Sequence, residues 1–270
     1  MKNNYKKRIV YLVIYIILSL VIVLSLIYII KFFLIKKEAV KERNLLNTIE
    51  ISEEKIERTI LVKEKEQTEE EKEKARRILQ VQELQKENDD IVGWIEIENT
   101  NISYPVVQGE DNDYYLTHNS QKEKAEQGAI FLDCNYNWNL ESNNLMIYGH
   151  YMNNGEMFTD LLKYVDEEFY KEHPIIRFTT AEEDTEYDII STFRSKVYYK
   201  SEKDAFKYYN FMNAKTEKEY NDFIENIKKL SLYDIDEIAE YGDRLITLST
   251  CTYYTEDGRF VVVGRERSNL

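Results

Sequence analysis

The first part of the chain is an uninterrupted apolar run. Residues Ile9–Ile30 read IVYLVIYIILSLVIVLSLIYII, without a single charged side chain. At 1.5 Å per residue, a helix of this length crosses a hydrocarbon core of about 30 Å. The run is longer than the apolar stretch of a cleaved signal peptide, and no Ala-x-Ala pattern follows it. We therefore predict a retained transmembrane helix over residues 9–30.

The segment that follows is strongly charged. Residues 31–87 are rich in Glu and Lys and contain neither Gly nor Pro. Sparse apolar residues near its end include Leu79, Val81 and Leu84. We predict a charged helical stalk whose last apolar positions pack onto the domain that follows. Basic residues flank the apolar run on both sides, so charge only weakly favours a cytoplasmic N-terminus over residues 1–8.

Beyond residue 88 the pattern changes to short apolar or alternating runs, which are typical of β-strands. The eight runs are Ile91–Ile97, Ile102–Val107, Gly128–Leu132, Leu145–Tyr148, Ile175–Phe178, Tyr187–Phe193, Leu245–Leu248 and Phe260–Val263. The pattern predicts one mainly β domain over residues 88–270, built as a barrel or a sandwich.

Two helical stretches interrupt the predicted strands, at Met157–Tyr170 and Glu217–Leu230. In the second, apolar residues recur at helical spacing, which indicates one face packed on a core. The formal net charge of −14 combines 36 basic with 50 acidic residues and forms no acidic tail. A chain with this balance is not expected to bind nucleic acid.

The chain has two cysteines, Cys134 and Cys251, which are too few for a disulfide framework. No C-x-x-C or His-x-x-x-His spacing indicates a metal site, so we expect neither a metal nor a cofactor. Cys251 ends a predicted strand, and Arg259 begins the next one after a short polar loop. If these strands are neighbours, the guanidinium approaches the thiol. The alternative for any lone cysteine is a small buried apolar residue.

Acyl transfer at a cysteine needs a thiolate, a stabiliser of the oxyanion and an acid for the leaving amine. Arg259 is the candidate stabiliser, and a histidine is the candidate acid. His118 and His173 lie in polar turns, where histidines usually face water. His150 instead follows a predicted strand directly after Gly149. The residues alone leave open whether His150 is catalytic or an ordinary turn histidine.

The segment Thr247–Cys251, with Arg259 eight residues later and Ile147–His150 upstream, resembles the sortase signature. Other stretches resemble class B sortases in particular: Val92–Ile95, Ile102–Gln108, Asn112–Leu116, Gly128–Asp133, and Gly149–Met152 leading to Met157 and Phe158. The similarity covers nearly the whole chain from residue 88 onward. Cys134 departs from the family pattern, and we expect it to be structural.

The resemblance implies an eight-stranded β-barrel with N-terminal helices and a helix in the long connection before the Cys strand, here within residues 200–243. It implies that Cys251, His150 and Arg259 are the catalytic residues. Arg265 is the alternative arginine, but it lies about 20 Å farther along the strand. The implied substrate-groove residues are Asn112, Leu116, Tyr148, Ser249 and Thr250.

In this family the cysteine cleaves a C-terminal sorting signal, typically with Pro second and Thr fourth, after the Thr. A peptidoglycan amine then resolves the thioester. The resemblance implies sorting-signal-bearing surface proteins and a cell-wall amine as partners. It also implies a single-pass membrane protein with its N-terminus inside and its catalytic domain outside. Whether the enzyme anchors a few surface proteins, such as haem-uptake proteins, or polymerises pilins stays open.

Other classes of protein fit the residues less well. An L,D-transpeptidase carries a His-Gly-Cys cluster, which this sequence lacks. In a papain-like protease the Cys precedes the His, whereas here His150 precedes Cys251. A third alternative is a membrane-tethered binding domain without catalytic activity, in which Cys251 is incidental.

Overall fold

The computed structural model describes residues 2–60, 68–138, 144–199, 201–202, 204–252 and 257–267. The chain divides into two compact units, residues 1–38 and residues 39–270. The first unit is part of helix α1 (Lys2–Arg43). Its apolar side chains from Tyr11 to Leu34 are largely exposed. By length and composition, α1 is able to cross a membrane.

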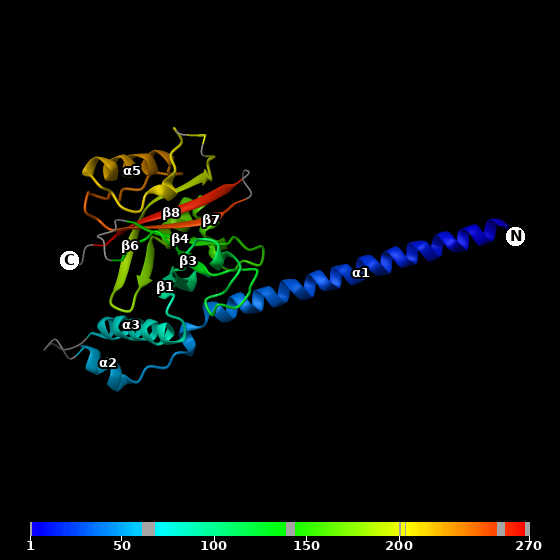
Figure 1. Ribbon diagram of the computed structural model, residues 1–270, viewed down its shortest axis with the longest axis horizontal. Coiled ribbons are helices and arrows are strands. Elements are labelled where there is room, and N and C mark those ends of the chain that lie inside the picture. The colour runs from blue at the N-terminus through cyan, green and yellow to red at the C-terminus, as the bar shows by residue number, and fades with distance from the viewer. Residues whose placement is uncertain are drawn as a thin grey trace. The chain divides into compact units, whose positions relative to one another are not determined.

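Eight strands form a closed barrel in the second unit (Figure 1). They run in the spatial order β1-β2-β3-β4-β7-β8-β6-β5, and β5 pairs with β1 to close the barrel. The strands are β1 (Ile91–Glu96), β2 (Ser103–Val107), β3 (Ile130–Leu132), β4 (Asn144–Gly149), β5 (Ile175–Thr179), β6 (Asp184–Lys196), β7 (Leu245–Cys251) and β8 (Gly258–Glu266). The predicted eight-stranded barrel is thus confirmed.

Strand β8 is apolar on both faces because each face packs on a different core. Phe260 and Val262 belong to the cluster inside the barrel, whereas Val261 and Val263 pack in a second cluster with helix α5 (Glu217–Leu230). Successive side chains of a strand point to opposite faces, so the continuous run VVV serves both clusters. Helices α5 and α3 (Glu69–Glu87) lie on different sides of the barrel in Figure 1.

The helix predicted over Glu217–Leu230 is α5. The Thr216 side chain caps its first turn by accepting a hydrogen bond from the Glu219 backbone N–H. The helical stretch predicted over Met157–Tyr170 consists of a 3₁₀ helix, η3 (Phe158–Val165), and a short helix α4 (Glu167–Glu172). Asp166 separates them because its backbone is extended and its side chain caps α4.

Residues 39–87 belong to the second compact unit and are helical over much of their length. They contain the end of α1, the 3₁₀ turn η1 (Leu46–Thr48), α2 (Glu53–Ile60) and α3 (Glu69–Glu87). Val81 and Leu84 of α3 are buried in one cluster with Trp94 of β1. Val81 and Leu84 therefore pack on the barrel as predicted, whereas Leu79 packs in a separate cluster with Ile56 of α2.

The remaining described short helices are η2 (Tyr114–Leu116) and η4 (Tyr208–Asn210). Helix η2 lies in the connection between β2 and β3, and η4 in the connection between β6 and α5. Tyr115 and Tyr208 are each about 1% exposed and anchor these turns in the core. Both turns carry residues that contact the site described below.

Candidate active site

Cys251 and Arg259 are brought together by strand pairing. Strands β7 and β8 are antiparallel, and their register places Cys251 directly opposite Arg259. Directly opposite residues of an antiparallel pair project from the same face, with Cβ atoms about 4.5–5.5 Å apart. Cys251 is the exposed last residue of a strand whose other six residues are buried. The thiol is therefore held by the sheet behind it and open to solvent.

The Arg259 guanidinium is oriented by the turn that precedes it. Its Nη1 donates to the Gly258 carbonyl oxygen at 2.9 Å and to the Asp257 carbonyl oxygen at 3.3 Å. Asp257, which directly precedes β8, has a left-handed backbone with φ of 53°. These contacts occupy one side of the guanidinium and leave other N–H donors for a ligand, since an Arg carries five.

Arg265 lies at the other end of β7 from Cys251. It stands opposite Leu245 in the β7–β8 register. Its Nη2 lies 3.6 Å from an Asp188 carboxylate oxygen and 3.4 Å from a Glu237 carboxylate oxygen. The register therefore places Arg259, and not Arg265, beside the cysteine.

His150 reaches the same barrel edge through a parallel strand pair. Tyr148 and Gly149 of β4 pair with Ser249 and Thr250 of β7. The carboxyl ends of neighbouring parallel strands lie at the same edge of the sheet. His150, which follows β4, and Cys251, which ends β7, therefore lie at the same edge. Gly149 is required at its position because a Cβ atom there would collide with the side chains of Ile130 and Phe158.

The His150 ring is held between a carbonyl group and the thiol. Its Nε2 lies 2.9 Å from the Leu116 carbonyl oxygen. A carbonyl oxygen only accepts hydrogen bonds, so Nε2 carries the proton and Nδ1 is the nitrogen left to exchange a proton. The Cys251 thiol is the other partner of the ring, since each of the two groups shifts the pKa of the other. The ring thus has a fixed tautomer and a thiol partner.

The interactions of this pair favour its charged form. The hydrogen bond to Cys251 raises the pKa of His150, and the Leu116 carbonyl raises it further, while burial opposes both. The hydrogen bond to His150 lowers the pKa of Cys251, and the charge of Arg259 lowers it further, against the effect of burial. Both directions favour a thiolate beside an imidazolium, which is the reactive form of a cysteine nucleophile.

Two of the predicted groove residues, Asn112 and Tyr148, meet at Asp133. The Asn112 amide and the Tyr148 hydroxyl each donate to the same Asp133 carboxylate oxygen at 3.0 Å. The other oxygen accepts from the backbone N–H and the side-chain amide of Asn135. Asp133 is only 3% exposed, so it is a buried carboxylate with four hydrogen-bond donors.

The other predicted groove residues lie in different environments. Ser249 is buried and shares a hydrogen bond of 2.8 Å with the Tyr208 hydroxyl. Thr250 is also buried, and its hydroxyl has no hydrogen-bond partner within the described part of the chain. Leu116 has a partly exposed side chain and offers its carbonyl oxygen to His150.

The remaining histidines and the second cysteine have other partners. His118 stacks on Tyr114 with ring centroids 4.0 Å apart. His173 lies with Nδ1 3.0 Å from the Glu98 carbonyl oxygen. Burial raises the pKa of the Cys134 thiol, the opposite direction to Cys251. The pKa of the Cys251 thiol is lowered and that of the Cys134 thiol is raised, so only Cys251 of these two is favoured as a thiolate.

Sequence reasoning missed the Asp133 network and the carbonyl of Leu116. Asp133 directly follows a strand in the segment Gly128–Asp133, and a buried strand followed by Asp was the available signal. A backbone carbonyl leaves no signal, because every residue has one. Within the described ranges, no group of three or more His, Cys, Asp or Glu side chains could hold a metal ion.

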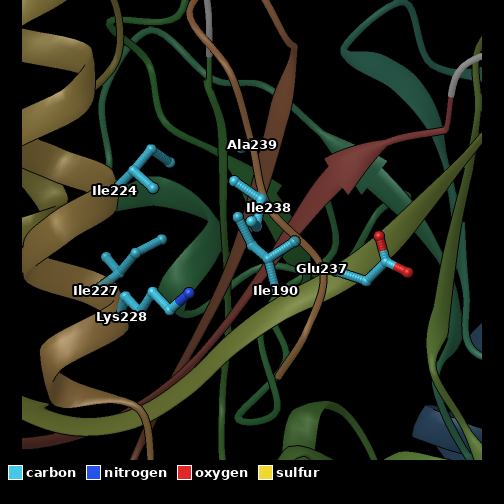
Figure 2. A pocket seen from close by; sticks show the side chains of 7 residues that line it. All are labelled: Ile190, Ile224, Ile227, Lys228, Glu237, Ile238 and Ala239. Atoms are coloured by element: carbon cyan, nitrogen blue, oxygen red, sulfur yellow. The ribbon is translucent and has the colours of Figure 1, made fainter. Parts of the chain in front are cut away.

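A small cavity lies away from these residues, between α5 and the segment that precedes β7 (Figure 2). Its volume of about 20 Å³ corresponds to about one water molecule. The lining residues are Ile190, Ile224, Ile227, Lys228, Glu237, Ile238 and Ala239. The cavity contains none of the candidate site residues and is too small for a peptide.

Comparison with known proteins gives consistent matches. The sortase domain model matches residues 95–267. Sortase B of Listeria monocytogenes is 36% identical over 188 residues, which cover 69% of this chain and 73% of that protein. Sortase B of Staphylococcus aureus is 32% identical over 188 residues, covering 69% of this chain and 74% of that protein.

Solved structures match as well. Sortase B of Bacillus anthracis in complex with AAEK1 has a TM-score of 0.62 and 35% identity, covering 70% of this chain and 85% of that chain. The Staphylococcus aureus sortase B–substrate complex has a TM-score of 0.67 and 26% identity, and the match covers 87% of this chain and 98% of that chain. With this barrel and these relatives, the chain belongs to the sortase family of cysteine transpeptidases, and within it to class B.

Proposed function

We propose that Cys251 is the nucleophile, His150 the proton-transfer residue and Arg259 the oxyanion stabiliser of this transpeptidase. The single observation that carries the proposal is the arrangement around Cys251: Arg259 lies opposite it in the strand register, and His150 follows the neighbouring parallel strand at the same barrel edge. Nucleophile, acid and cation are then within reach of one reacting carbonyl, as acyl transfer requires.

In the proposed first half-reaction, the Cys251 thiolate attacks the carbonyl carbon of the scissile peptide. The negative charge that develops on the carbonyl oxygen is stabilised by the Arg259 guanidinium. The His150 imidazolium then donates its proton to the leaving amine as the C–N bond breaks. The products are a thioester on Cys251 and a neutral imidazole.

In the second half-reaction, a primary amine attacks the thioester carbon and gives a proton to His150. The C–S bond breaks, and Cys251 leaves as a thiolate beside the imidazolium. The thiol and the ring thus return to their starting charges without any other reactant. Tight fixing of Nε2 by Leu116 favours both steps, because it keeps Nδ1 on the side of the thiol.

We propose as substrates secreted surface proteins with a C-terminal sorting signal that has Pro second and Thr fourth, cleaved after the Thr. The acceptor is an amine of peptidoglycan or of its precursor. Asn112, Leu116, Tyr148, Ser249 and Thr250 remain the proposed groove residues. Helix α1 anchors the chain in the cell membrane, with residues 1–8 in the cytoplasm and the catalytic domain outside.

Mass spectrometry of the full-length protein in detergent micelles tests this proposal. The protein is incubated with a library of Pro-x-Thr pentapeptides that carry C-terminal extensions, with and without an amine acceptor. We expect an acyl adduct on Cys251, cleavage after Thr, and loss of the adduct when the amine is added. The identity of the adduct also defines the preferred signal.

The two cysteines provide a matched control. Cys251→Ala is expected to abolish the adduct, whereas Cys134→Ala is expected to retain it. An adduct that persists in Cys251→Ala would remove Cys251 from the proposed role. A wild-type protein that forms no adduct with any peptide, although iodoacetamide still alkylates Cys251, would contradict the proposed substrate class.

A further inference from the structure

We propose that Glu42, in the last turn of α1, is a positioning residue for His150, acting through the connection that carries the Leu116 carbonyl. This inference rests on the proposed role of His150. It assigns to residues 39–43 a function in the active site besides that of joining α1 to the barrel.

The first step of the argument is the burial of the α1 end. Ala39 is fully buried in the same cluster as barrel residues such as Ile95. Glu42 is 7% exposed, although it stands in a segment of largely exposed charged residues. A buried carboxylate is costly unless it is hydrogen-bonded. Its environment is therefore specific and differs from that of the exposed neighbour Lys41.

The second step is the contact that Glu42 makes. Its Oε1 accepts a hydrogen bond from the Ser120 backbone N–H at 2.8 Å, in a buried setting. The Ser120 carbonyl oxygen accepts from the Asn88 side-chain amide at 2.7 Å. Asn88 is the C-cap of α3. Both backbone polar groups of Ser120 are thus bound by side chains from the N-terminal helices.

The third step is the position of Ser120 within its loop. Residues 117–125 form a small hairpin, in which the Asn119 N–H donates to the Glu123 carbonyl and the Ala125 N–H donates to the Thr117 carbonyl, both at 2.8 Å. Ser120 lies in the turn at the tip of this hairpin. Holding the tip restricts rotation of the hairpin about its base at Thr117.

The fourth step leads from the hairpin base to the catalytic ring. Leu116 directly precedes Thr117, and its carbonyl oxygen receives the His150 Nε2–H at 2.9 Å. A shift of this carbonyl would release the ring or rotate it away from the thiol. Misplacement of a reacting group by about 1 Å reduces turnover strongly. Glu42 therefore acts on the reaction through Ser120 and Leu116.

The test compares substitutions at Glu42 in the full-length protein in detergent micelles. Glu42→Ala removes the acceptor, Glu42→Asp shortens the side chain beyond reach of Ser120, and Glu42→Gln keeps an oxygen acceptor in place. Glu38→Ala is the matched control, since this exposed glutamate lies one turn earlier in α1. The measurements are thermal unfolding, kcat and KM, and the rate of Cys251 alkylation by iodoacetamide against pH.

We expect Glu42→Ala and Glu42→Asp to lower kcat by on the order of tenfold, with little change in KM. Their alkylation profiles move to higher pH, because a misplaced imidazole no longer stabilises the thiolate. Glu42→Gln and Glu38→Ala are expected to match the wild type. A purely structural role for Glu42 would lower the unfolding temperature and leave the alkylation profile of the folded protein unchanged, which would overturn the proposal.

If Glu42→Ala does not fold, the pair Glu42→Asp and Glu42→Gln decides: equal alkylation profiles in these two variants would overturn the proposal. Failure of the proposed function is distinguishable, since it appears as an absence of peptide turnover in the wild type. Alkylation needs no peptide and still reports whether Glu42 controls the environment of Cys251.

Discussion

The two sides of the active site are built in different ways. On one side, Cys251 and Arg259 are opposite residues of neighbouring strands, and their separation is fixed by backbone register. On the other side, the His150 ring is hydrogen-bonded to the Leu116 carbonyl in the connection between β2 and β3. The side chains of Asn88 and Glu42 bind the Ser120 backbone in the same connection. The backbone pairing that fixes this separation is kept through most side-chain substitutions. A connection held by side-chain hydrogen bonds can shift when one of those side chains is replaced.

The largest expected effect is a loss of kcat when Arg259, on the strand side of the site, is replaced. Arg259→Lys is expected to lower kcat by about 10²–10³-fold, because one ammonium cannot replace the guanidinium fork at the oxyanion. Steady-state transpeptidation of a sorting-signal peptide measures this. Stability should change little, since the strand register does not need the guanidinium.

Arg265→Lys is the control for this substitution, because Arg265 lies on the same strand at the other end of the β7–β8 pair. We expect its kcat to equal that of the wild type. Near-normal turnover in Arg259→Lys would exclude Arg259 as the oxyanion stabiliser. Equal losses in both variants would indicate a general effect of cations on β8.

An intermediate effect is expected on the free energy of unfolding when Asp133, on the loop side of the site, is replaced. Asp133→Ala leaves the donors of Asn112, Tyr148 and Asn135 without their acceptor, at a cost of about 2–3 kcal/mol in the free energy of unfolding. Urea unfolding followed by circular dichroism measures this cost. An unchanged free energy of unfolding would mean that the Asp133 network does not hold the loops.

Asp111→Ala is the comparison for this experiment. Asp111 also accepts two backbone N–H groups, from Asp113 and Tyr114, but these lie at the surface. We expect the smaller cost that is typical of an exposed capping residue, about 1 kcal/mol. The difference between the two variants separates burial from hydrogen bonding as the source of stability.

The smallest expected effect is a change in the pH dependence of Cys251 alkylation when His150 is replaced. The interaction with His150 lowers the pKa of Cys251, and the same interaction raises the pKa of His150. The thiolate therefore persists to lower pH in the wild type than in His150→Ala. We expect the alkylation profile of Cys251 to move to higher pH in that variant. A profile that does not move would show that His150 does not stabilise the thiolate.

Much of the barrel could be predicted from local patterns. Each predicted strand falls on or overlaps a strand of the structure, because alternation and short apolar runs are local signals of burial. The stretch predicted as helical over Met157–Tyr170 is helical, but it consists of two elements, η3 and α4. Its apolar spacing suits both helix types, and the break at Asp166 depends on a cap that forms only once the chain turns.

The site could be predicted in part. A cysteine and an arginine separated by a short polar loop suggest a hairpin, and the β7–β8 register confirms that these residues face each other. The partnership of His150 with Cys251 depends on parallel pairing of β4 with β7, which no local pattern contains. Glu42 could not be singled out at all, because it resembles the other glutamates of a charged segment.

The parallel pairing of β4 with β7 also bears on when the enzyme acquires its reactivity. His150 lies far upstream of Cys251, and their strands meet only after the long connection and α5 have been made and packed. Contacts between such distant segments form slowly during folding. If His150 acts as proposed, the Cys251 thiol of a newly synthesised chain therefore lacks its histidine partner until the barrel closes.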